Sequence, residues 1–265
     1  MTTANSKKQS DTMIVRNTIQ RGSIILLMGP TGSGKSTFVN LLTKDENASG
    51  GHDLKYHVKT TQYVDPLSGI SMRLVDTPAF DDNRSNVSDT DVLAKIARFL
   101  HDDDTQDVNG ILYFHRISEH RMGGPIKKNL KVFKQLCGDN NFSHVRIITT
   151  HWNLVDEKEG KAREAALANG PFKTFVKGGA KFVRHDQSVE SARSIVNEFI
   201  HHSPFQLKIQ EELDFGQALG DTSAGGVLME EIQAMQEKVE REAEAVRKDM
   251  VDAAYRGDDQ KLMAQ

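Results

Sequence analysis

The sequence has little of what membrane-spanning, secreted or zinc-binding proteins need. A single cysteine, Cys137, among 265 residues excludes an internal disulfide and a zinc site built from cysteines, as is typical of a reducing compartment. The longest purely apolar run, Ile24 to Met28, is far shorter than the roughly 20 residues of a membrane helix. The first residues also lack the apolar core of a signal peptide, so we expect a cytoplasmic protein without a membrane span.

Aromatic residues are also few, at 6%, but apolar residues make up 37% and charged residues 27% of the chain. This composition is typical of a globular protein and excludes disorder throughout. The net charge of −3 is unevenly distributed, because residues 203–265 hold 14 acidic and only 7 basic residues. A net charge of this size does not favour a nucleic-acid partner, and we expect none.

Short apolar runs alternate with helix-length segments over residues 13–202, whereas residues 1–12 are polar and are expected to be disordered. The alternation predicts an α/β domain over 13–202, with a mostly parallel six-stranded sheet, helices on both faces and the ligand at the carboxyl ends of the strands. Residues 203–265 are predicted to form an acidic helical C-terminal extension. The strands are expected near 23–28, 60–64, 72–75, 110–114, 145–149 and 181–183, and helices after Gly34, Ser88 and Pro125 and over 157–168 and 188–201.

The C-terminal extension is expected to be interrupted at Gly216, Gly220 and the pair Gly225-Gly226. From Leu228 onward, apolar residues recur with a mean step nearer 3.6 than 3.5, which favours a helix packed on its own domain over a long left-handed coiled coil. Pairing of this helix with a second subunit is the alternative. Four lysines of the helix after Pro125 are expected to form a solvated face: Lys127, Lys128, Lys131 and Lys134.

The strongest chemical signal follows the first predicted strand. Gly29 to Thr37 reads Gly-Pro-Thr-Gly-Ser-Gly-Lys-Ser-Thr, a complete GxxxxGK[ST] sequence that is followed by a helix-competent segment. In such a loop, backbone N–H groups and the helix N-terminus surround phosphate, the lysine contacts the β- and γ-phosphates, and the serine ligates Mg²⁺. The sequence therefore predicts a phosphate-binding loop with Lys35 and Ser36 in these roles.

A second anchor lies forty residues beyond Ser36, where a predicted strand ends in Asp76. P-loop proteins place a carboxylate at this position beside the magnesium ion. Ser36 and Asp76 are therefore the expected metal ligands, and Mg²⁺ the expected cofactor.

Further segments carry a family resemblance. Asp76-Thr77-Pro78-Ala79 resembles the DxxG element of GTPases, and residues 114–118, 121–124 and 149–153 extend the likeness. Together they resemble the G domain of a group of fungal proteins related to septins, immunity-associated GTPases and chloroplast import GTPases, over roughly residues 20–250. The resemblance implies a G-domain fold that binds GTP and GDP.

The resemblance also implies roles for individual positions. The phosphates are expected at Gly29, Pro30, Thr31, Gly32, Ser33, Gly34, Lys35, Ser36 and Thr37, and the base at Thr150, His151, Trp152 and Asn153, flanked by Arg184 and His185. The Mg²⁺-binding threonine of the first switch is assigned to Thr60, with Thr61 and Val58 as competing alignments.

Two departures from the family pattern bear on function. Ala79 stands where the family has the glycine of its γ-phosphate sensor, and Asn153 stands where an aspartate reads guanine. An amide accepts one of the two guanine hydrogen bonds and presents a donor to the other, so guanine selectivity is expected to fall, and XTP and ATP stay open as ligands.

The group that positions the attacking water is not evident, because Phe80 occupies the place of the Ras glutamine. Asp81, just beyond it, is a candidate for this role. Arg116 and Arg121 lie in the region that related GTPases use for dimer contact, where an arginine supplied to the partner's γ-phosphate would add the missing charge.

The sequence thus predicts a Mg²⁺-dependent phosphohydrolase that converts GTP to GDP and is activated by dimerisation through the face of the G domain. One alternative is a nucleotide-gated scaffold with little turnover. The other, which rests on Asn153, is an ATPase or a broad-specificity NTPase.

Overall fold

The computed structural model describes residues 23–43, 58–80, 88–101, 108–119 and 122–262. All six predicted strands are present in this part of the chain, in the spatial order β2-β3-β1-β4-β5-β6. Every neighbouring pair is parallel except β2 and β3. The strands are β1 (Ser23–Met28), β2 (Lys59–Val64), β3 (Ser71–Asp76), β4 (Gly110–Arg116), β5 (Val145–Thr150) and β6 (Lys181–Arg184). The predicted mostly parallel six-stranded α/β fold is confirmed.

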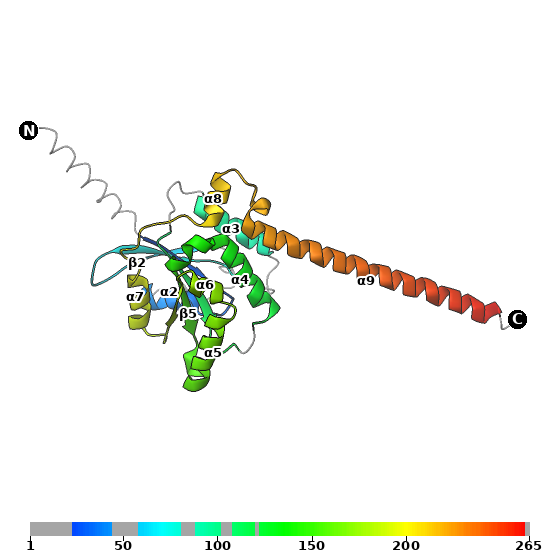
Figure 1. Ribbon diagram of the computed structural model, residues 1–265, viewed down its shortest axis with the longest axis horizontal. Coiled ribbons are helices and arrows are strands. Elements are labelled where there is room, and N and C mark those ends of the chain that lie inside the picture. The colour runs from blue at the N-terminus through cyan, green and yellow to red at the C-terminus, as the bar shows by residue number, and fades with distance from the viewer. Residues whose placement is uncertain (1–22, 44–57, 81–87, 102–107, 120–121, 263–265) are drawn as a thin grey trace, which may run out of the picture.

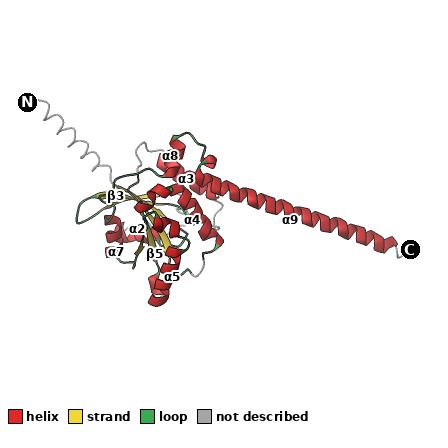
Figure 2. Cartoon of the chain, in the orientation of Figure 1, coloured by secondary structure: helices red, strands yellow, loops and turns green. Residues whose placement is uncertain are grey.

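Helices cover both faces of this sheet, as Figure 2 shows. The α-helices are α2 (Lys35–Thr43), α3 (Asp89–His101), α4 (Gly124–Cys137), α5 (Glu157–Asn169), α6 (Lys173–Lys177), α7 (Val189–Asn197), α8 (Lys208–Asp214) and α9 (Ser223–Leu262). Short 3₁₀ helices are η2 (Asp139–His144), η3 (Trp152–Leu154) and η4 (Leu219–Asp221). The helix expected over 188–201 is shorter than predicted, and α6 was not anticipated.

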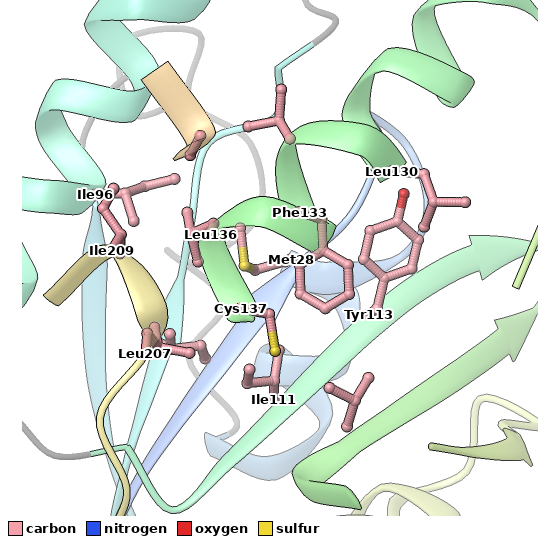
Figure 3. Close-up of a cluster of buried hydrophobic side chains, with 14 of the residues drawn as sticks. Met28, Ile96, Ile111, Tyr113, Leu130, Phe133, Leu136, Cys137, Leu207 and Ile209 are labelled. Atoms are coloured by element: carbon pink, nitrogen blue, oxygen red, sulfur yellow. The ribbon is translucent and has the colours of Figure 1, made fainter. Parts of the chain in front are cut away.

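The core has two halves because the central strands are buried on both faces. One half packs the sheet against α2 and α7, and the other packs it against α3, α4, α8 and the start of α9. In the second half, Phe133, Leu136 and Leu130 of α4 meet the sheet residues Tyr113 and Ile111 (Figure 3). These residues form the inward apolar face of α4.

The β2–β3 hairpin is the antiparallel edge of the sheet, and a buried carboxylate holds its turn. Asp65 accepts hydrogen bonds from the Ser68 backbone N–H and hydroxyl, from Tyr63 Oη and from Asn197 Nδ2. Burial raises the pKa of Asp65, but these hydrogen bonds, led by those of Ser68, outweigh burial and hold the pKa at about 2. The turn is therefore stabilised by the ionised carboxylate.

Replacing this carboxylate by an amide is expected to destabilise the fold. A pKa held below its unfolded value of 3.8 contributes stability above pH 4, which is lost as the pH falls toward 2. Asp65→Asn should therefore lower the free energy of unfolding at pH 7 by about 2 kcal/mol and flatten its pH dependence between pH 4 and 2. Urea unfolding across this pH range is the measurement, with the exposed Asp139→Asn as the control. An unchanged pH profile would contradict this account.

The C-terminal extension differs from its prediction in two ways. Gly225 and Gly226 do not interrupt it but lie inside α9. A Cβ on Gly225 would collide with the Leu219 carbonyl oxygen and the Gly220 backbone. Gly225 therefore permits close packing against η4 rather than ending a helix. In addition, only the first turns of α9 pack on the domain, and the rest projects away from it (Figure 1).

Lysines of α4 hold the start of α9 in place. Lys128 forms ion pairs with Asp89 of α3 and with Glu231, and Lys131 pairs with Glu230. The lysine cluster is thus not only a solvated face, since it joins three helices. Within the described residues, none of the helices combines the length and the apolar character needed to cross a bilayer.

Candidate functional site

The loop between β1 and α2 has a backbone that only glycine adopts readily. Gly29, Gly32 and Gly34 have φ angles of 132°, 75° and 103°. At Gly29 a side chain would also collide with the Phe114 carbonyl oxygen. The glycines therefore let the loop curl at the carboxyl end of β1, beside β4.

Lys35 lies at the N-terminus of α2, and its side chain folds back onto this loop. Its Nζ donates hydrogen bonds to the carbonyl oxygens of Gly29, at 2.7 Å, and Pro30, at 3.1 Å, and the side chain is 8% exposed. Carbonyl contacts hold the ammonium group in a position from which it can contact a phosphate lying in the loop.

Ser36 and Asp76, forty residues apart in sequence, meet at the ends of α2 and β3. The Ser36 hydroxyl donates to Asp76 Oδ2 at 2.7 Å. The parallel pairing of Leu27 with Asp76 places the carboxylate beside the loop, and Thr77 Oγ1 donates to the Leu27 carbonyl oxygen at 2.8 Å. A hydroxyl and a carboxylate oxygen at this spacing are a donor set that fits Mg²⁺.

A cavity of about 200 Å³ opens beside the loop. It joins the phosphate loop to the ends of β5 and β6, so the first and last parts of the predicted nucleotide site come together. Its lining residues are Gly32, Gly34, Lys35, Ser36, Thr37, Thr150, His151, His185 and Gln187. Within the described residues, no carboxylate lines this cavity.

Thr150 connects the two sides of the cavity. Its hydroxyl donates to the Ser33 carbonyl oxygen at 2.8 Å, and its side chain lies under Gly34. When this hydroxyl proton is donated to Ser33, the 2.9 Å contact with His151 Nδ1 is a hydrogen bond in the tautomer whose Nδ1 carries the proton. The Nε2 atom of neutral His151 is then a hydrogen-bond acceptor.

Both histidines of the cavity are held neutral. Burial, reinforced by the nearby charge of Arg116, lowers the pKa of His151, and burial lowers the pKa of His185. His185 Nδ1 contacts Ser191 Oγ at 3.0 Å, and its ring packs edge-on against Phe38. Two uncharged imidazoles therefore line the cavity at the ends of β5 and β6, an environment that suits a flat, neutral group.

Gln187 is a lining residue that sequence reasoning missed. Its φ of 67° turns the backbone after β6 toward the cavity. The neighbouring Asp186 carboxylate accepts hydrogen bonds from the Ser188 backbone N–H and hydroxyl, which forms a local turn. The sequence Asp-Gln-Ser after β6 is typical of such a turn, and it is the feature from which Gln187 could have been predicted to lie at the site.

Three residues expected at the base do not line the cavity. The Arg184 guanidinium lies 4.1 Å from the Trp152 ring centroid and forms an ion pair with Glu164, while Trp152 Nε1 donates to the Thr149 carbonyl oxygen. Trp152 and Arg184 thus support the turn rather than face the cavity. Asn153 is exposed on η3. The cause is His151, whose left-handed conformation (φ 59°) ends β5 and redirects the residues after it.

Removing the Thr150 hydroxyl is expected to loosen the cavity. Thr150→Val keeps the shape of the side chain but leaves the Ser33 carbonyl oxygen and His151 Nδ1 without their partner. Each unpaired buried group costs about 1–3 kcal/mol, so nucleotide affinity should fall at least about tenfold. Titration with nucleotide measures this, and the exposed Thr174→Val is the matched control. Equal affinity in the two variants would show that the hydroxyl does not organise the cavity.

Arg116, at the end of β4, lies against the phosphate loop of its own chain. A Cβ on Gly32 would lie 3.6 Å from Arg116 Nη1, and the guanidinium is paired with Glu119 at 3.3 Å. Beneath it, His115 is buried, and burial with the charge of Arg116 lowers its pKa to about 4. Arg116 is therefore the cation available beside the loop, while His115 stays neutral.

The remaining predicted residues are placed as follows. Ala79 and Phe80 are buried, and Phe80 packs into the core against the sheet, so it cannot polarise water. Thr60 is exposed in β2, one residue beyond Lys59, which pairs with Asp76. Thr60 does not line the cavity. Asp81 and Arg121 lie outside the described residues.

The fold is similar to that of solved G domains. The structure of Toc33 from Arabidopsis thaliana in complex with GDP and Mg²⁺ is 14% identical, covers 77% of this chain and 96% of that chain, and has a TM-score of 0.54. Its complex with Mg²⁺ and GMPPNP is 16% identical, covers 76% and 92%, and has the same TM-score. A dimerization-deficient Toc33 mutant matches at 14% identity, over 72% and 91%, again with a TM-score of 0.54. The likeness shows a G-domain P-loop fold.

The amino-acid sequence also matches the model of one protein family. No curated protein matches the chain. A family model described as ABC transporter matches residues 13–252, which is most of the chain. Together with the G-domain fold, this match supports nucleotide binding and hydrolysis at a general level. By its extent, the chain belongs to the P-loop family that the model describes, the ABC transporter family.

Proposed function

We propose that this protein is a Mg²⁺-dependent nucleoside triphosphatase that hydrolyses GTP to GDP and phosphate. The observation that carries the proposal is the arrangement at the carboxyl ends of β1 and β3. There Lys35 is drawn over a loop of left-handed glycines and Ser36 is hydrogen-bonded to Asp76. These groups are the ones that phosphoryl transfer needs, since its chemistry is mainly positioning and charge neutralisation.

Each group has a distinct part in this reaction. The loop N–H groups and Lys35 hold the β- and γ-phosphates, and Ser36 and Asp76 hold the metal. When bound there, Mg²⁺ would supply charge neutralisation to the transferred phosphoryl group. The Toc33 structures, whose descriptions name GDP, GMPPNP and Mg²⁺, support the same ligands here. Phosphate release from GTP, with and without EDTA, tests the proposal, and tight binding without release would favour the nucleotide-gated scaffold.

Arg116 is the residue that we assign to neutralising charge on the γ-phosphate. Its guanidinium lies beside Gly32 and is held by Glu119, both within one chain. Dimer activation through the G-domain face is a separate part of the proposal. It is supported by Arg121 in the sequence and by a solved structure whose description states that dimerization is important for the GTPase activity of chloroplast translocon components. Specific activity that rises with protein concentration would support it, and constant activity would exclude it.

Broad purine specificity is the second candidate function, and the cavity favours it. No carboxylate lines the cavity in the described part of the chain, and Asn153 is exposed. A guanine ring therefore lacks the acceptor pair that normally selects it over adenine. A panel of GTP, ATP and XTP, each with Mg²⁺, ranks the bases for the wild type and for Asn153→Asp. Residue 153 does not line the cavity, so it must turn toward the base when nucleotide binds for the substitution to raise the GTP-to-ATP preference, by about tenfold or more. An unchanged ranking would mean that residue 153 does not read the base.

A further inference from the structure

Helix α9 carries an exposed apolar stripe along the segment that projects away from the domain (Figure 1). Forty residues at 1.5 Å per residue make α9 about 60 Å long. Leu228 is buried on the domain, but the apolar side chains that follow are between 41% and 69% exposed. These are Ile232, Met235, Val239, Val246 and Met250, with exposed Ala243 between them.

Two pairs of identical residues in the stripe are symmetric about one point. Val239 and Val246 are equidistant from the point between Glu242 and Ala243, and so are Met235 and Met250. That point is also the midpoint of α9, which runs from Ser223 to Leu262. This spacing suits an antiparallel pair of identical helices, in which a two-fold axis brings Val239 to Val246 and Met235 to Met250 of the other copy.

The charges beside the stripe suit the same arrangement. Glu240 and Arg247 are exposed and, being seven residues apart, lie on the same side of the stripe. An axis at the helix midpoint brings Glu240 of one helix close to Arg247 of the other, and symmetry forms this pair twice. The helix as a whole has ten acidic and six basic residues, which disfavours an anionic membrane as its partner.

The position of the domain on α9 favours an antiparallel partner helix over a parallel one. Leu228 belongs to the stripe and is buried against the domain, so the domain and the stripe lie on the same side of α9. A parallel partner would bring both domains into the space between the helices at one end. An antiparallel partner places the two domains at opposite ends of the pair, so only the last turns of each partner helix, near residue 257, approach the domain at Leu228.

We propose that α9 binds a second copy of this chain through an antiparallel, two-fold symmetric helix pair centred between Glu242 and Ala243. Val239 packs on Val246 of the other copy and Met235 on Met250. The interface is separate from the nucleotide site, so it forms without nucleotide.

Mass measurement across protein concentration, without nucleotide, tests the interface. We expect the full-length chain to have twice the monomer mass and Val239→Glu to raise the dimer dissociation constant at least about tenfold, because a charge would be buried in the seam. Glu240→Arg should weaken the dimer and Glu240→Arg/Arg247→Glu should restore it. Unchanged nucleotide binding by Val239→Glu shows that it is folded. A monomeric wild type, or a dimer that Val239→Glu leaves intact, would overturn the proposal.

Disulfide cross-linking tests the orientation. In the antiparallel pair the two copies of residue 239 are about 10 Å apart along the axis, beyond disulfide reach, whereas residue 239 meets residue 246. Mixing Val239→Cys and Val246→Cys proteins should give a cross-linked dimer, and Val239→Cys alone should give none. The native Cys137 is buried and does not interfere. Cross-linking of Val239→Cys alone would indicate a parallel pair and overturn the assignment.

Discussion

Lys35→Ala is expected to lower nucleotide turnover by about 100-fold to 1,000-fold, the usual cost of removing one preorganised donor to the transition state. Lys35 is nearly buried, and its ammonium group is already fixed by the Gly29 and Pro30 carbonyl oxygens, so little reorganisation is needed when phosphate binds. Alanine removes the charge without filling the space. Steady-state phosphate release at saturating GTP and Mg²⁺ is the measurement.

The exposed Lys177→Ala is the control for charge and should retain wild-type turnover. Lys35→Ala should also fold, because the lysine stabilises bound phosphate rather than the core, and unfolding by urea checks this. Turnover within a factor of about three of the wild type would remove Lys35 from the mechanism and leave the loop without its expected cation.

The phosphate loop could be predicted from sequence because its chemistry depends on the backbone. Glycines in fixed positions, a preceding strand and a following helix are sufficient to determine where the N–H groups point. The same holds for Asp76, whose place at the end of β3 follows from the parallel pairing with β1. The central strands β1, β3, β4 and β5 were predicted for a related reason, since buried parallel strands are short apolar runs.

The base end of the site was predicted less well because it depends on side-chain direction in a turn. A single left-handed residue, His151, decides that Trp152 turns toward Arg184 rather than the cavity. Non-glycine residues seldom adopt this conformation, and no neighbouring residue indicates it. Gln187 enters the cavity by a similar turn after β6.

For the C-terminal helix, the sequence predicts the helix itself but not how much of it packs on the domain. Its apolar period predicted a helical face but not where the domain beneath it ends, which is set by the position of α4 and α8. The two glycines suggested an interruption because helix propensity is local, whereas the need of Gly225 for close contact with η4 comes from a distant segment.

Asp76→Asn is expected to lower turnover by about 100-fold at a fixed, low Mg²⁺ concentration, because an amide is a poorer ligand than a carboxylate for a divalent cation. Ser36 donates to Asp76 and would ligate the same ion, so the two side chains act as a unit. Ser36→Ala should therefore have an effect of the same kind, and the double variant should lose little more than the more impaired single variant. Phosphate release across a Mg²⁺ titration measures all three.

The titration separates metal binding from other defects. If Asp76 acts through the ion, a higher Mg²⁺ concentration should recover part of the lost turnover in Asp76→Asn, whereas Lys35→Ala should gain nothing from added metal. The exposed Asp139→Asn controls for the loss of a carboxylate elsewhere and should follow the wild-type curve. Fully additive losses in the double variant would mean that Ser36 and Asp76 do not share a ligand, even though their side chains are hydrogen-bonded to each other at 2.7 Å.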